Sequence, residues 1–202
     1  NRFLDNRLQV NVEVFYWDYK DQQIGLLSNI NPAGQSTRPL NIPGYAQGVE
    51  LDLQWLITPN DRLKLLLLNE AGKYDIFPTT ANAAGVVLGG LTNYPRVNMP
   101  RWNGTLDYEH YFPLSNGARI TAGVNLHGET ESNLRPIAAS APGDFRRGFY
   151  TSDIDIIYVP ESEKWRVTAF VDNAGNEPVA GTGTSGTVST PIWYRPAAPY
   201  NT

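Results

Sequence analysis

The 202-residue sequence contains no cysteine and no long run of apolar residues. Without cysteine, the chain has no disulfide framework and no thiolate metal site. The longest apolar run, near Leu65 to Leu68, is far shorter than the roughly 18 residues that a membrane helix requires. The sequence shows no signal peptide, and it begins at Asn1 without methionine close to a strand-like segment. We therefore expect a fragment of a longer protein.

Basic residues are also scarce. The chain has 16 Lys and Arg against 20 Asp and Glu, which gives a net charge of -4 and a pI near 5.2. A surface that binds nucleic acid needs clustered Lys and Arg to neutralise phosphates. We therefore expect no nucleic-acid partner.

Alternation of apolar and polar residues dominates the sequence, whereas helical periodicity is hard to find. In the first segment, apolar Val10 and Val12 alternate with polar Asn11 and Glu13. This pattern is typical of strands with one apolar and one polar face. The fold class predicted is all-β, with strand segments in residues 4–21, 46–57, 62–74, 102–111, 119–129, 149–159 and 165–173.

Two kinds of connection alternate along the chain. Short ones fall near residues 5–6, 58–61, 113–117 and 160–164 and carry turn-forming residues. Long ones run near residues 25–44, 77–99, 130–148 and 174–191. Short and long connections therefore lie at opposite ends of the strands, as in an antiparallel up-and-down meander. Outer-membrane barrels show this asymmetry, with short periplasmic turns and longer extracellular loops. A soluble sandwich would share the alternation but not the loop asymmetry.

Aromatic residues gather near the short turns. Bilayer interfaces favour such amphipathic rings at the level of the headgroups. Aromatic residues are also good strand formers, so the clustering alone leaves both explanations open. The residues concerned are Trp55, Tyr111, Phe112, Tyr158 and Trp165.

Four stretches resemble TonB-dependent outer-membrane receptors: FLDNRLQVNVEVFYWDYKDQQ, GYAQGVELDLQWLITPNDRLKLLLL, PRWNGTLDYEHYFPL and WRVTAFVDNAGNEPV. The resemblance implies a transmembrane barrel of about 22 strands with a plugged lumen. This sequence supplies roughly eight strand patterns and neither a plug domain nor a TonB-binding segment. We therefore expect residues 1–202 to form a partial C-terminal β-barrel domain.

Carboxylates in the middle of the strands are expected to line a wet lumen. Pairs such as Asp107 with Glu109 could also serve as an acid and a base, or bind Ca²⁺. In a barrel they more simply hydrate the interior. The predicted lumen-lining residues are Glu13, Glu50, Asp52, Asp107, Glu109 and Asp155.

Aromatic and Arg side chains assigned to the long connections are candidates for ligand contacts, because binding residues are often carried by loops. The alternative is that they pack or solvate ordinary loops. The candidates are Tyr74, Phe77, Tyr94, Arg96, Arg135, Phe145, Arg146, Arg147 and Trp193.

Other motifs point to no catalytic chemistry. The G-x-G-x-x-G match at 181–186 precedes a β-branched run that ends in Pro191, and not the helix that a dinucleotide site needs. His110 and His127 each lie near a glutamate, but no third ligand with useful spacing appears. No nucleophile elbow accompanies a Ser-His-Asp order. We expect no metal site, no cofactor and no enzyme activity.

By resemblance, the protein would be a TonB-dependent receptor in the outer membrane of a Gram-negative bacterium. It would take up a scarce ligand such as an iron-siderophore, a vitamin or a saccharide. Its partners would be outer-membrane lipid, its own plug domain, TonB and the small-molecule ligand. A passive porin-type channel and a soluble β-sandwich that binds carbohydrate are the alternatives.

Overall fold

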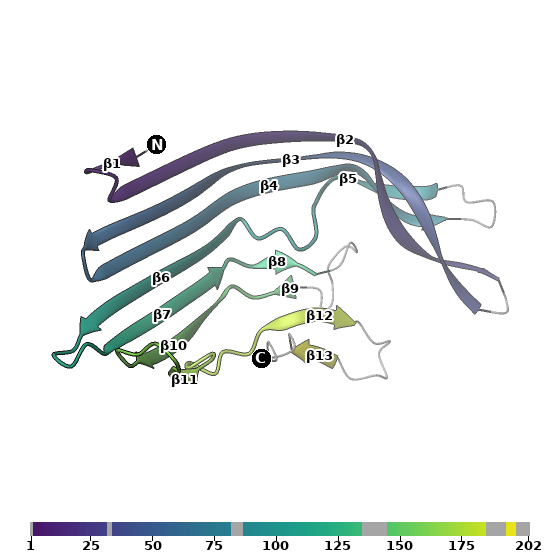
Figure 1. Cartoon of the computed structure of the whole chain (residues 1–202). Coiled ribbons are helices and arrows are strands. Elements are labelled where there is room, and N and C mark those ends of the chain that lie inside the picture. The colour runs from purple at the N-terminus through teal and green to yellow at the C-terminus, as the bar shows by residue number, and fades with distance from the viewer. Residues whose placement is uncertain (1, 32–33, 82–86, 135–144, 185–192, 197–202) are drawn as a thin grey trace.

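The computed structural model describes residues 2–31, 34–81, 87–134, 145–184 and 193–196. No helix in these ranges is long and apolar enough to cross a membrane. The ordered elements of this part of the chain are all strands (Figure 1). They are β1 (Arg2–Phe3), β2 (Leu8–Asn31), β3 (Gly34–Thr58), β4 (Asp61–Ala81), β5 (Val87–Pro95), β6 (Trp102–Pro113), β7 (Arg119–Glu129), β8 (Ser132–Asn133), β9 (Phe145–Arg146), β10 (Phe149–Val159), β11 (Val167–Val171), β12 (Ala180–Thr184) and β13 (Trp193–Pro196).

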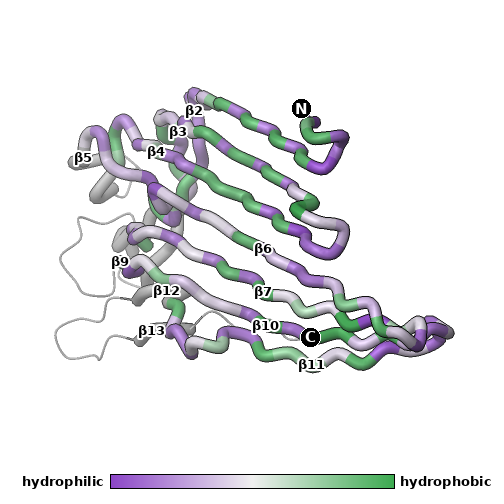
Figure 2. The backbone as a smooth tube through the Cα atoms, turned by 90° about the vertical axis from the view of Figure 1, so that its left-hand side faces the viewer, coloured by the Kyte–Doolittle hydropathy of each residue, from purple (hydrophilic) through white to green (hydrophobic). Residues whose placement is uncertain are grey.

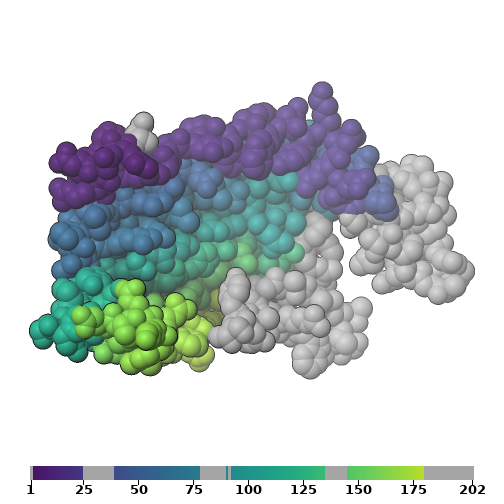
Figure 3. Space-filling view, viewed as in Figure 1, coloured from purple at the N-terminus to yellow at the C-terminus, as the bar shows by residue number. Residues whose placement is uncertain are grey.

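Nine strands form one antiparallel sheet with the order β1-β2-β3-β4-β6-β7-β10-β11 and β5 paired to β4. Each strand lies beside its neighbour in the chain, apart from β5 and the short β8–β9 pair, so the predicted meander is confirmed. In the space-filling view the strands follow one another in chain order across one continuous surface (Figure 3). The strands β12 and β13 form a separate two-stranded sheet.

The cross-strand register sorts side chains onto two faces. Between β2 and β3, Val12 lies opposite Leu51, and Val10 and Val14 likewise face apolar partners. One residue further along, Glu13 lies opposite Glu50 on the other face, because successive side chains of a strand point in opposite directions. The hydropathy colours accordingly alternate along β2, β3 and β4 (Figure 2). The sheet has one apolar and one polar face.

The apolar face is exposed and not packed into a core. Val12 is 63% exposed and Val14 is 76% exposed. Buried hydrophobic residues in the described part of the chain are few, and none lies in the middle of this face: Ile42, Ala46, Tyr74, Phe77, Ala118 and Leu134. An extended apolar surface of this kind marks an interface with a membrane or with other protein surface.

The predicted long connections at 25–44 and 77–99 are wrong over much of their length. The strands β2 and β3 continue to Asn31 and from Gly34, with Ile24 opposite Leu40. The second range holds the end of β4 and all of β5. Neither range alternates clearly, and backbone pairing itself requires no pattern in the side chains. This explains why periodicity missed these extensions.

A register shift between Tyr19 and Gln22 divides the β2–β3 hairpin into two parts. Bulges of this kind bend a strand and increase its local twist. Beyond it, β2 and β3 twist away from the rest of the sheet (Figure 1). One part of the hairpin therefore lies within the sheet, and the other part projects from it.

The strands meet at short turns at the opposite end of the sheet. Leu4, Asp5 and Asn6, in the turn between β1 and β2, all have positive φ angles between 53° and 65°. In the β6–β7 turn, Gly117 has a φ of 78°, which glycine adopts without steric penalty. The predicted short turns between β3 and β4 and between β10 and β11 are also present. The predicted short turns are thus confirmed.

A charge on the apolar face should destabilise the protein in a bilayer. Leu65 lies between Leu53 and Leu106 on this face, whereas its neighbour Leu66 lies between Asp52 and Thr105 on the polar face. We expect Leu65→Arg to lower the free energy of unfolding in lipid vesicles by about 2–4 kcal/mol, as Arg does near the bilayer midplane. Leu66→Arg is the matched control and should change it little. Equal losses for both variants would contradict the assignment of faces.

Candidate functional site

Three of the predicted ligand-contact residues form an aromatic cluster beyond the bulge. The ring centroids of Tyr74 and Phe77 are 5.3 Å apart, and those of Phe77 and Tyr94 are 5.5 Å apart. Tyr74 is 4% exposed, Phe77 is 1% exposed, and Ile42 completes the buried core of the cluster. Tyr74 and Phe77 belong to β4 and Tyr94 to β5, so placing them on a loop was wrong. Their packing holds the outer parts of β3, β4 and β5 together.

Arg96 stacks on two aromatic rings on the polar face. Its guanidinium carbon lies 4.6 Å from the ring centroid of Tyr19 and 5.2 Å from that of Tyr74. The backbone N–H of Arg96 donates to the carbonyl oxygen of Gly72 at 3.1 Å. Stacking on an aromatic face attracts the cation without using its N–H groups. The head group is therefore positioned while its hydrogen-bonding capacity remains available.

The close approach of the Arg96 side chain to the backbone of β4 depends on Gly72. A Cβ atom at this position would collide with Cδ of Arg96 and would lie 2.6 Å from the carbonyl oxygen of Tyr45 and 2.9 Å from Sδ of Met99. Only glycine leaves this space. The arginine side chain therefore lies directly over the backbone of β4.

A hollow of about 590 Å³ opens beside Arg96, between β4 and the short pair β8–β9. Its charged lining residues are Glu70, Lys73, Arg96, Arg101 and Glu131, and Met99 and Phe145 add apolar surface. Ser132 of β8 also lines it and is 5% exposed. Within the described residues, neither Nη1 of Arg96 nor Oγ of Ser132 has a hydrogen-bond partner, and both atoms are buried.

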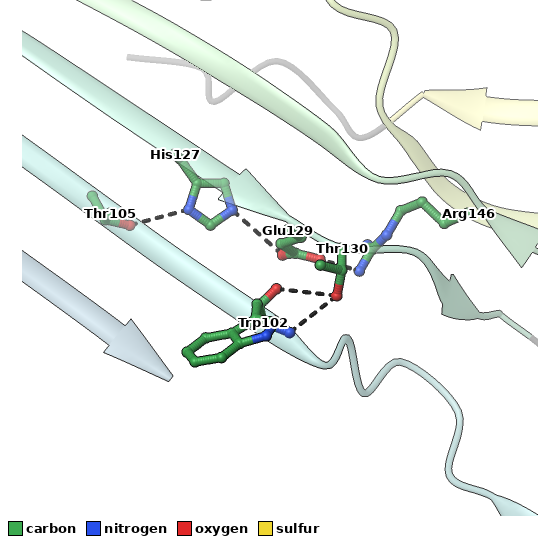
Figure 4. A network of polar contacts seen from close by, with 6 residues as sticks. All are labelled: Trp102, Thr105, His127, Glu129, Thr130 and Arg146. Carbon is green, nitrogen blue, oxygen red and sulfur yellow. Dashed lines mark hydrogen bonds and ion pairs between the residues drawn. The ribbon is translucent and has the colours of Figure 1, made fainter. Parts of the chain in front are cut away.

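A chain of polar contacts lies next to the hollow on the polar face (Figure 4). A hydrogen bond of 3.1 Å joins Oγ1 of Thr105 to Nδ1 of His127, and Nε2 of His127 lies 3.4 Å from Oε1 of Glu129. The other oxygen of Glu129 accepts a hydrogen bond from Nη2 of Arg146. Glu129 therefore connects β7 to β9.

Arg146 is thus held inside the protein by its hydrogen bond to Glu129, while its Nε atom is buried and has no hydrogen-bond partner among the described residues. Its side chain is 15% exposed, that of Glu129 is 13% exposed, and its guanidinium carbon lies 5.4 Å from the ring centroid of Phe149. Phe145 is 48% exposed at the hollow, and Arg147 is exposed. Trp193 lies in β13, but its side chain, like the whole of Arg135, lies outside the described residues.

The predicted lumen carboxylates all lie on the polar face. Glu13 is opposite Glu50, and Asp107 is opposite Lys64 on one side and Asn125 on the other. The amide of Asn125 donates to Asp107 at 2.5 Å. The remaining three are likewise placed by register: Asp52 opposite Asn11, Glu109 opposite Arg62, and Asp155 opposite Gly123. The six carboxylates therefore share one polar face of the sheet.

A second polar cluster lies at the short-turn end. Asp61, the first residue of β4, accepts a hydrogen bond of 2.5 Å from the Tyr108 hydroxyl and lies 2.6 Å from Nδ1 of His110. It also accepts a hydrogen bond from the hydroxyl of Thr58. These contacts fix the turn.

In the described part of the chain, no group of three or more His, Cys, Asp or Glu side chains is placed to hold a metal ion.

A model of the TonB dependent receptor-like β-barrel family matches residues 2–174. The chain belongs to this family. No curated protein sequence matches it. Solved structures match it at 14–15% identity, which concerns the fold alone.

Three of these structures are receptors or transporters. The ferric yersiniabactin uptake receptor FyuA from Yersinia pestis has a TM-score of 0.68 and 14% identity over 93% of this chain and 25% of that chain. The siderophore receptor PiuA from Acinetobacter baumannii has a TM-score of 0.61 and 14% identity over 88% of this chain and 23% of that one. The copper transporter OprC has a TM-score of 0.63 and 15% identity over 96% and 28%. The chain spans about a quarter of the length of each.

Of the residues predicted as ligand contacts, Arg96 and Phe145 line the hollow of this TonB-dependent receptor barrel; Glu70, Gly72 and Ser132 also line it and were not among the candidates. Gly72 interrupts the pattern of a Leu-rich strand, which is a recognisable signal of close backbone approach. Ser132 carries no such signal, because its burial depends on the pairing of β8 with β9.

Loss of Gly72 should displace Arg96. We expect Gly72→Ala to lower the free energy of unfolding by about 1–3 kcal/mol, the usual result of overpacking. The control is Gly175→Ala, because a Cβ atom at Gly175 meets nothing within 4 Å. Denaturant titration of the refolded protein measures both variants. No loss of stability in Gly72→Ala would contradict the close contact.

Phe77 should act through packing. We expect Phe77→Ala to destabilise the region beyond the bulge by about 3 kcal/mol, the lower end of the range for buried Phe. Faster hydrogen exchange of the β4 and β5 amides would report this loss. Ile76→Ala removes a neighbouring side chain that is 53% exposed and should leave exchange unchanged. Normal exchange together with weaker ligand binding in Phe77→Ala would instead favour the original assignment as a ligand contact.

Proposed function

We propose that this chain forms part of the wall of a TonB-dependent transporter that takes up a scarce small molecule across the outer membrane of a Gram-negative bacterium. The transporter moves its ligand and does not transform it chemically. The single observation that carries the proposal is the two-faced sheet, exposed and apolar on one side and polar on the other, in a chain whose family is that of the TonB-dependent receptor barrels.

The apolar face suits contact with lipid. In a membrane barrel, outward residues are apolar and inward residues are polar. The strands of this sheet supply both sets in a single register. The strands β3, β4, β6 and β7 each pair with a neighbour on both sides, as the bilayer interior requires, whereas β2 is paired to β1 at only two residues. Further strands of the full-length protein would pair with the two edges of the sheet and close the barrel.

The family and the similar structures support uptake of a ligand in place of passive leakage. Two of these structures are named as siderophore-related receptors and one as a copper transporter. An iron chelate, a vitamin or a saccharide is the proposed ligand. The partners would be a plug domain inside the lumen and TonB, which would supply energy from the inner membrane.

Two other functions fit less well. A passive porin-type channel would share the two-faced wall but not the family. A soluble sandwich that binds carbohydrate needs a second sheet packed on the apolar face. The described residues form one large sheet and two short pairs, and they leave that face exposed.

Dependence on TonB tests the proposal directly. The full-length protein, expressed in a Gram-negative host, should support uptake of radiolabelled iron from a panel of siderophores, and deletion of tonB should reduce this uptake to background. The protein must be present in the outer membrane at equal amounts in both strains. Entry that is unaffected by loss of TonB would instead favour a passive channel.

The lumen carboxylates should matter for passage more than for assembly. We expect the combined change Glu13→Gln and Glu50→Gln to reduce uptake severalfold while the amount of folded protein in the membrane stays the same. The reason is that these side chains hydrate the polar face and belong to no buried core. Glu161→Gln, in an exposed turn, is the control. A loss of insertion with unchanged uptake per molecule would contradict a lumenal position.

A further inference from the structure

We propose that the hollow beside Arg96 binds a carboxylate group of the ligand, with Nη1 of Arg96 and the hydroxyl of Ser132 as the two donors. The inference rests on the proposed transport function and names its ligand class, an anionic carboxylate-bearing molecule. It is separate from the wall of lumen carboxylates, whose charge has the opposite sign.

The first support is the state of Arg96. Stacking on Tyr19 and Tyr74 holds its guanidinium in place, yet Nη1 is buried and has no acceptor among the described residues. A buried charged donor without a partner is unfavourable, because it has lost its hydration without gaining a hydrogen bond. None of the ion pairs within 4.0 Å between described residues includes Arg96, and the carboxylate of Glu70, which interacts with it electrostatically, lies beyond that distance. Native proteins contain few such donors, and a bound ion or ligand is one way in which the missing acceptor is supplied.

The second support is independent of the first. Ser132 lies on a different segment, is 5% exposed, lines the same hollow, and has no hydrogen-bond partner for its Oγ atom within the described residues. A hydrogen bond of 2.7 Å from the N–H of Asn98 to the carbonyl oxygen of Asn133 fixes β8 next to the segment that carries Arg96. Two unpaired donors from distant parts of the sequence therefore line one cavity.

The charge of the lining favours an anion. Three cations, Lys73, Arg96 and Arg101, line the hollow with two carboxylates, Glu70 and Glu131. A guanidinium presents planar donors that match a carboxylate, whereas it repels a metal cation. The described residues also include no group of three or more potential metal ligands, which argues against direct binding of a bare metal ion at this place.

The size and the rim suit an organic molecule. Small-molecule pockets typically enclose about 300–1,000 Å³, and the hollow falls within this range at about 590 Å³. Met99 and the exposed Phe145 provide apolar surface beside the donors. The carboxylate would lie at Arg96 and Ser132. The body of the ligand would contact Met99 and Phe145.

Tricarballylate and its uncharged trimethyl ester are suitable probes, because they share a carbon skeleton and differ in charge. Calorimetry on the full-length protein in detergent should detect binding of the tricarboxylate at concentrations up to about 10 mM, at which a millimolar Kd is measurable. The ester should bind at least about tenfold more weakly, since it cannot form charge-assisted hydrogen bonds.

Two variants separate binding from structure. Arg96→Gln should weaken tricarballylate binding by about tenfold or more, the usual effect of losing a charged hydrogen-bond donor. Ser132→Ala should weaken it by about threefold to tenfold without lowering the melting temperature, because it removes a hydroxyl that has no partner in the protein. A merely structural role for Ser132 would leave affinity unchanged.

Arg62→Gln is the matched control, since it removes an Arg that pairs with Glu109 at 3.6 Å near the short-turn end. It should bind the probe like the wild type. The inference is overturned if tricarballylate does not bind, if the ester binds equally well, or if Arg96→Gln and Ser132→Ala retain full affinity. Any of these results with intact TonB-dependent uptake would refute the carboxylate site and leave the transport proposal standing.

Discussion

Hydrogen bonds between the backbones of neighbouring strands are the interaction on which the other features of this wall depend. Among the described residues, no protein core covers the face of the sheet that carries Val12 and Leu51, so burial of side chains contributes little there. Ladder bonds hold the strands together and also fix which residues are side by side. A shift of one residue in β3 would move Glu50 and Asp52 from the polar face to the apolar face. The ladder therefore determines both stability and polarity.

Beyond the bulge in β2, side chains take over part of this role. Tyr74, Phe77 and Ile42 form the buried cluster, and Arg96 lies across the face of β4 on two aromatic rings. The candidate site lies where the part of the sheet held by backbone hydrogen bonds meets the part that packed side chains also hold together. Its floor is the regular strand at Glu70 to Gly72, and its far wall is the short pair β8–β9. A rigid base with an irregular rim is a common arrangement for a binding site.

Much of the sheet could be predicted from the sequence, because a sheet with one apolar face and one polar face imposes a period of two on its strands. The predicted segment 119–129 coincides with β7, and 149–159 coincides with β10. The outer half of β2 and all of β5 lie outside the regular two-faced sheet, so their residues need not alternate between apolar and polar. They therefore gave no periodic signal. The candidate site depends on contacts between residues far apart in sequence. Arg96 was a candidate because it is an arginine in a segment expected to be a loop. Its stacking on Tyr19 and its position beside Ser132 depend on the fold and leave no signal in the sequence.

The length of the first hairpin has a structural consequence. The strand β2 has 24 residues, whereas a tilted transmembrane strand needs only about 9–11. At about 3.3 Å per residue, the arms of the hairpin reach as far past the bilayer as they do through it. The two arms stay paired along this length, with register shifts between Tyr19 and Gln22 and between Ser28 and Asn31, so the projection is a paired ribbon that continues the two strands carrying Glu13 and Glu50.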